Sequence, residues 1–107
     1  MKQIRALELA EWLADNNRPA PILLDVREAM ELEICCLPAV KHIPMHLLPI
    51  HRDELPSDQD IVVICHHGAR SMQVAQFLVH HGFEQVHNLT GGIEAWAIEV
   101  DPKMRRY

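Results

Sequence analysis

The stretch Ile61-Val62-Val63-Ile64-Cys65-His66-His67-Gly68-Ala69-Arg70-Ser71 joins a run of apolar residues to an amphipathic segment. Its first four residues are β-branched, which is typical of a strand that is buried on both faces. The run stops at a single cysteine, and Met72 then opens a helical pattern that lasts to Gly82. The free N–H groups of the loop and of the first helical turn should therefore point at one place, backed by the positive end of the helix dipole.

Cys65 stands where this arrangement stabilises an anion. A helix N-terminus or a nearby cation favours the thiolate form of a cysteine, and Arg70 supplies a cation in the same loop. Gly68 allows the backbone to curl so that several N–H groups converge. A small buried residue at a strand end is the alternative interpretation, but the order of strand, Cys-x4-Arg-Ser loop and helix favours a reactive nucleophile.

His66 and His67 are expected at the rim of this loop, because the side chains of such a loop point outward while its N–H groups point inward. They should influence access to Cys65 and the local charge. A metal site built from them and Cys65 is not expected, because consecutive residues do not easily converge on one ion.

The rest of the chain alternates apolar strands with amphipathic helices. Strands are expected at about residues 2–5, 22–25, 40–43, 61–64 and 84–89, and helices at about 6–13, 28–34, 47–55, 72–81 and 93–100. This alternation predicts an α/β fold, with a mostly parallel sheet covered by helices on both faces. No linker, repeat or low-complexity segment interrupts it, so residues 1–107 are expected to form one domain.

Composition narrows the classes of partner and compartment. The net charge of −5 disfavours nucleic acid, because phosphate binding needs a basic face. No apolar run approaches the ~18 residues that cross a bilayer, and the first residues lack the apolar core of a signal peptide. The three cysteines, two of them adjacent, suit a compartment where thiols stay reduced. We therefore expect a cytoplasmic protein with no nucleic-acid or membrane partner and no cofactor.

Sites in parallel α/β sheets form beyond the carboxyl ends of the strands. Asp25 and Arg27 leave a strand and should lie at the same end as Cys65, where they are expected to support the loop. A surface ion pair contributing ~0–1 kcal/mol is the alternative. Cys35 and Cys36 enter a strand and should lie at the opposite end, as packing residues without metal-site spacing.

These blocks resemble those of the single-domain rhodaneses, a family of sulfurtransferases. The matching residues include Leu24-Asp25-Val26-Arg27-Glu28, His42-Ile43-Pro44, Ile61-Val62-Val63-Ile64-Cys65, Gly68-Ala69-Arg70-Ser71 and Gly91-Gly92-Ile93-Glu94-Ala95-Trp96. The resemblance implies a rhodanese-like fold, with a central five-stranded sheet and helices on both faces. It also implies that Cys65 takes the outer sulfur of a donor such as thiosulfate and passes it, from a persulfide, to cyanide or another thiol. The residues implied in holding the donor and the persulfide are His66, His67, Gly68, Ala69, Arg70 and Ser71, with Arg70 attracting the anionic donor.

Two other functions stay open at this point. Cysteine phosphatases use a Cys-x5-Arg loop, whereas Cys65 and Arg70 enclose one residue fewer, which suits a single sulfur atom better than a phosphoryl group. A phosphatase or arsenate reductase is the enzyme alternative. A non-catalytic rhodanese-fold module that binds proteins is the other, although the intact cysteine and arginine argue against it.

One segment departs from the family pattern. Where relatives commonly carry Gly-His-Ile-x-Gly-Ala, this chain has Cys35-Cys36-Leu37-Pro38-Ala39-Val40. The loss of both glycines predicts a different local turn. Its expected place at the far end of the sheet predicts a change in packing more than a change in activity.

Overall fold

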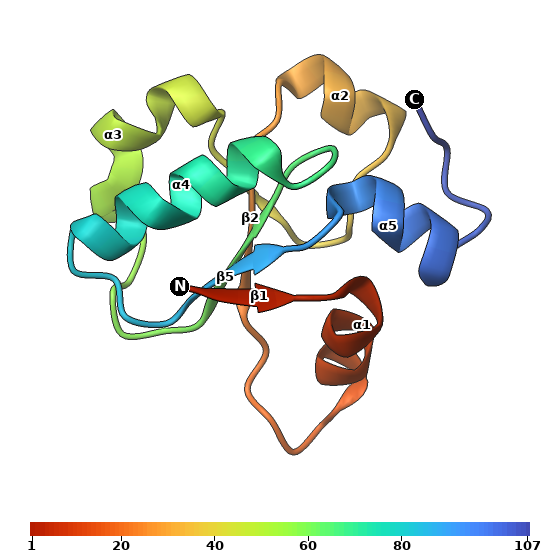
Figure 1. Cartoon of the computed structure of the whole chain (residues 1–107), viewed down its shortest axis with the longest axis horizontal. Coiled ribbons are helices and arrows are strands. Elements are labelled where there is room, and N and C mark those ends of the chain that lie inside the picture. Colours follow the sequence, from red (N-terminus) through yellow and green to blue (C-terminus); the bar gives the residue numbers. More distant parts are fainter.

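The computed structural model describes all 107 residues and has a single five-stranded parallel sheet as its centre (Figure 1). The strands are β1 (Lys2–Ile4), β2 (Ile22–Asp25), β3 (Lys41–His42), β4 (Ile61–Ile64) and β5 (Val86–Leu89), in the order β1-β5-β4-β2-β3. The α-helices are α1 (Ala6–Ala14), α2 (Ala29–Ile34), α3 (Leu48–His51), α4 (Ala69–His80) and α5 (Gly92–Glu99), and the short 3-10 turns η1 (Met45–Leu47) and η2 (Arg52–Glu54) flank α3. Every strand pair is parallel, which confirms the predicted α/β fold.

The central strand β4 divides the apolar core into two layers. Ile61 and Val63 pack into one layer with residues of α3 and α4, whereas Val62 and Ile64 pack into the other with residues of α1 and α5. All four side chains are fully buried. The run of four β-branched residues is therefore explained by helices on both faces of the sheet, as Figure 1 shows.

Helix α4 begins three residues earlier than its apolar pattern indicates. Met72 opens the pattern, but the helix starts at Ala69, directly after Gly68 in a left-handed conformation with φ of 106°. Arg70 and Ser71 therefore lie in the first helical turn and not in a loop. The pattern failed here because Ser71, although polar, is fully buried on the inner side of the helix.

The segment that departs from the family pattern keeps a left-handed turn. Ala39 has a φ of 60° and is the one residue other than glycine in this region of backbone conformation. It occupies the position of the second glycine of the common pattern, and glycine would adopt this conformation more easily than alanine. The following strand β3 is correspondingly short, with two residues instead of the predicted four.

The helices are short throughout, and α4, with 12 residues, is the longest. None of them combines the length and the apolar character that crossing a bilayer requires.

Candidate active site

Cys65 follows β4 at the carboxyl end of the sheet, and its side chain is held at the N-terminus of α4. The N–H group of Gly68 donates a hydrogen bond to Cys65 Sγ at 3.0 Å. The hydroxyl oxygen of Ser71 lies 3.2 Å from the same sulfur. An amide donor and the positive end of α4 thus face the sulfur atom, which is the environment that stabilises a thiolate. The side chain is 1% exposed and packs in the same core layer as Val63 and Val74.

The turn between β5 and α5 holds the loop that begins at Cys65 through two backbone hydrogen bonds. The N–H group of Ile93 donates to the carbonyl of Cys65 at 2.9 Å, and that of Glu94 donates to the carbonyl of His66 at 3.1 Å. Gly92 makes this approach possible, because a Cβ atom there would lie 2.3 Å from the His66 oxygen and 2.5 Å from the Cys65 oxygen. The Gly91-Gly92 pair of the sequence therefore serves the loop directly.

Asn88 is a site residue that sequence reasoning missed. Its amide nitrogen donates to the carbonyl of Gly68 at 3.3 Å and to the side chain of Gln3 at 3.0 Å, while its amide oxygen accepts from the Ser71 hydroxyl. The side chain is 2% exposed and stands in the middle of β5. A buried side-chain amide inside a sheet needs hydrogen-bond partners. The polar Asn88 within a predicted strand could therefore have indicated a structural role at the site.

Asp25 and Arg27 form a buried ion pair, not a surface pair. Both side chains are fully buried, with Nη2 of Arg27 2.8 Å from Oδ2 of Asp25. Arg27 also donates to the carbonyl of Cys35 at 2.8 Å and to the hydroxyl of Tyr107 at 2.9 Å. Burial lowers the pKa of Arg27, but its hydrogen bonds to Asp25 and Tyr107 outweigh that effect and raise it. Arg27 therefore stays charged, and it anchors the end of α2 and the tail of the chain through Cys35 and Tyr107.

Arg70 does not point freely into the site. Its two terminal nitrogens lie 2.7 and 2.8 Å from the two carboxylate oxygens of Glu31, in a bidentate pair. The Tyr107 hydroxyl donates a further hydrogen bond to Glu31 at 2.7 Å. Hydrogen bonding by Arg70, and secondarily by Tyr107, lowers the pKa of Glu31 to about 2 although its partial burial opposes this. Neither Glu31 nor Tyr107 was identified from the sequence.

The position predicted for Cys35 is wrong. Its carbonyl accepts a hydrogen bond from Arg27 at the carboxyl end of β2, and the residue lines a small hollow with His66 and Tyr107. Cys35 therefore lies at the same end of the sheet as Cys65. The chain does not cross to the opposite end before β3, because Lys41 and His42 pair with Leu24 and Asp25, the last two residues of β2. Cys36 is exposed.

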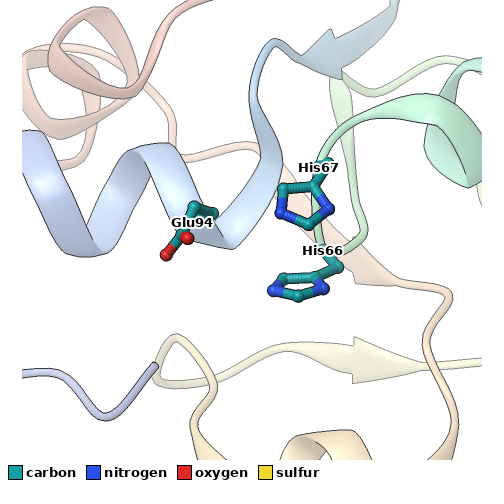
Figure 2. Close-up of side chains that lie close together, drawn as sticks. All are labelled: His66, His67 and Glu94. Atoms are coloured by element: carbon teal, nitrogen blue, oxygen red, sulfur yellow. The ribbon is translucent and has the colours of Figure 1, made fainter. Parts of the chain in front are cut away.

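His66, His67 and Glu94 gather at the rim (Figure 2). The two imidazole rings stack with centroids 3.8 Å apart, and the potential ligand atoms of the three residues all lie within 4.8 Å of one another. Consecutive histidines thus do face a common point, contrary to the argument from the sequence, although without Cys65. Glu94 is already engaged by Arg106, at 2.7 Å, so a metal ion would have to displace that guanidinium.

His66 is also covered by the tail of the chain. The ring of Tyr107 stacks on it at 3.8 Å with an angle of 10° between the planes. Burial and the neighbouring His67 lower the pKa of His66, so its ring is mainly uncharged at neutral pH.

The chain has clear relatives among known proteins. Residues 6–99 match the family described as Rhodanese-like domain. A sulfurtransferase of Allochromatium vinosum is 39% identical over 97 residues, covering 91% of this chain and 89% of that protein. The putative sulfurtransferase YtwF of Bacillus subtilis is 41% identical over 81 residues, covering 76% and 78%. The crystal structure of a rhodanese-related protein from Thermoplasma volcanium has a TM-score of 0.84 at 32% identity, with 94% of each chain covered. The resemblance inferred from the sequence is confirmed, and the chain belongs to the rhodanese-like family of sulfurtransferases.

Proposed function

We propose that this protein transfers a sulfane sulfur through a persulfide on Cys65, from a donor such as thiosulfate or a persulfide to a thiol or cyanide. The observation that carries the proposal is the placement of Cys65 Sγ, 3.0 Å from the Gly68 N–H group at the start of α4. A sulfur atom added to Cys65 would extend from this point toward the first turn of the helix. Backbone amides and the helix dipole stabilise negative charge there without any metal or cofactor.

The reaction divides into two steps around this residue. The Cys65 thiolate attacks the outer sulfur of the donor, a new S–S bond forms, and the donor's own bond to that sulfur breaks. With thiosulfate, sulfite leaves with the bonding electron pair. The acceptor thiolate or cyanide then attacks the outer sulfur of the persulfide and releases the Cys65 thiolate. Covalent catalysis of this kind gives ping-pong kinetics.

The geometry favours sulfur over phosphorus as the transferred atom. Gly92 has no side chain, so the carbonyls of Cys65 and His66 can approach its backbone closely. This close approach keeps the Cys-x4-Arg loop compact. Arg70, which a phosphatase would use to grip the phosphoryl oxygens, is instead held by Glu31. Both features disfavour the phosphatase and arsenate reductase alternative.

The test is the mass of the protein after incubation with thiosulfate. We expect an increase of one sulfur atom that disappears on adding cyanide, with formation of thiocyanate, and that is absent in Cys65→Ser. Hydrolysis of an aryl phosphate without thiocyanate formation would replace the proposal by the phosphatase alternative. A folded protein with neither activity would indicate a module that only binds proteins.

The partners that we propose are a small-molecule sulfur donor and a thiol or protein acceptor, with no nucleic acid or membrane. The net charge of −5 supports the exclusion of nucleic acid. The three cysteines are free, which favours the reducing conditions of the cytoplasm.

A further inference from the structure

Arg70, the cation expected to attract an anionic donor, forms an ion pair with the carboxylate of Glu31. Arg70 lies close enough to Cys65 for a thiolate there to contribute to its raised pKa, after the larger contribution from Glu31. The guanidinium nevertheless faces Glu31 with both of its terminal nitrogens, at 2.7 and 2.8 Å. One positive and one negative charge thus stand together beside the nucleophile.

The carboxylate of Glu31 is held in place from three directions. Besides Arg70, the Tyr107 hydroxyl donates to one oxygen at 2.7 Å, and the N–H group of Glu28 donates to the other at 3.0 Å. The side chain is 15% exposed, so solvent screens it only in part. Arg27, which also donates to Tyr107, is itself paired with Asp25 and supplies no free positive charge.

Sulfur donors differ in the charge that they bring to this place. Thiosulfate is a dianion, and its reaction with a thiolate gathers three negative charges in the transition state. The protonated persulfide of a thiol is uncharged at its reacting sulfur, so its reaction gathers one. In that case the Cys65 thiolate forms a bond to the outer sulfur, the inner S–S bond breaks, and the donor thiol leaves as a thiolate with the electron pair.

We propose that Glu31 determines donor specificity by cancelling the charge of Arg70, so that the site discriminates against thiosulfate and favours thiol persulfides. This inference rests on the proposed function. Even at the dielectric constant of bulk water, removing one negative charge at ~6–8 Å from a dianion changes the attraction of the site for it by roughly fivefold in rate. The effect on an uncharged donor should be near zero.

The experiment compares kcat/KM for thiosulfate and for cysteine persulfide in Glu31→Gln. Glutamine keeps the length of the side chain and one of its two oxygens, so it removes the negative charge together with the acceptor for either the Glu28 N–H group or the Tyr107 hydroxyl. We expect kcat/KM for thiosulfate to rise about 3- to 10-fold at low salt and to fall more steeply with added salt than in the native protein. The value for cysteine persulfide should change less than about twofold.

Glu33→Gln is the matched control. Glu33 lies on the same helix, is exposed, and makes no ion pair or side-chain hydrogen bond, so the net charge changes equally without affecting Arg70. The ratio of the two kcat/KM values should stay at the native value. The inference is overturned if Glu31→Gln leaves the ratio unchanged, or if Glu33→Gln shifts it as much.

Arg70→Met decides the question if Glu31→Gln does not fold. It leaves Glu31 charged beside Cys65 and should lower kcat/KM for thiosulfate at least tenfold more than for cysteine persulfide. An equal loss for both donors contradicts the inference. Failure of the proposed function looks different, because then no donor adds sulfur to Cys65 of the native protein.

Discussion

Replacing Gly92 by alanine tests the link between the β5–α5 turn and the nucleophile loop. Gly92 has a φ of 62°, and the new Cβ atom would lie 2.3 Å from the backbone oxygen of His66 and 2.5 Å from that of Cys65. Alanine pays ~1–2 kcal/mol for the left-handed conformation. Displacing two backbone carbonyls adds about 1–3 kcal/mol, the usual range for overpacking. We expect Gly92→Ala to lower the free energy of unfolding by about 2–5 kcal/mol.

Gly82→Ala separates these two contributions. Gly82 has a φ of 90°, and an added Cβ atom would meet nothing within 4 Å. This variant should lose only the ~1–2 kcal/mol of the backbone conformation and keep its activity. In Gly92→Ala the carbonyls of Cys65 and His66 must move, and a displacement of ~1 Å at a reacting group costs about 100-fold in rate.

The assays are urea unfolding followed by circular dichroism, and the rate at which thiosulfate adds sulfur to Cys65, measured by mass spectrometry. A Gly92→Ala protein that matches Gly82→Ala in stability and the native protein in loading rate would refute the argument. It would mean that the loop does not depend on the close approach at Gly92.

Three further predictions concern stability and the loop. Ala39→Gly should raise the free energy of unfolding by about 1 kcal/mol, because Ala39 has a φ of 60°; a lower midpoint of urea unfolding would contradict this. Glu31 has a pKa of about 2 instead of 4.5, so its stabilisation of about 3 kcal/mol is complete above about pH 5 and is lost as the pH falls toward 2. The stability difference between the native protein and Glu31→Gln should therefore shrink between about pH 5 and pH 2, and a constant difference would be the opposing result. Asn88→Ala removes the hydrogen bonds to Ser71, to the Gly68 carbonyl and to Gln3, although Ser71 keeps its contact with Cys65 and the Gly68 carbonyl keeps the Met72 N–H group. It should cost about 2–4 kcal/mol and slow sulfur loading, checked by the same unfolding and mass measurements.

The parts of the fold that follow from local patterns could be predicted from the sequence. The β-branched run of β4 and the periodicity of α1 and α4 each depend on which residues face the core, and that is visible in the spacing of apolar residues. The early start of α4 was missed because Ser71 is polar, and its burial depends on Asn88, 17 residues away.

The site shows the same division between local and distant information. Cys65 was identified because strand, loop and helix are contiguous in the chain. Glu31 is 39 residues from Arg70, and Tyr107 is 76 residues from Glu31, so no spacing rule connects them. Tyr107 follows an irregular segment after α5, and only the three-dimensional structure shows that it covers His66. Cys35 was misplaced because β3 has only two residues and pairs with the last two residues of β2, so the residues that lead into it stay near the carboxyl end of the sheet.

The edge strand β1 takes part in more than sheet formation. Gln3 accepts hydrogen bonds from Asn88 at 3.0 Å and from Thr90 at 2.9 Å, and Asn88 in turn holds Ser71 beside the sulfur. The first residues are thus joined to the nucleophile through two side chains. A fused tag, a truncation or proteolytic trimming that frays β1 would alter the reactivity of Cys65, so activities of such preparations should be compared only with those of the unaltered chain.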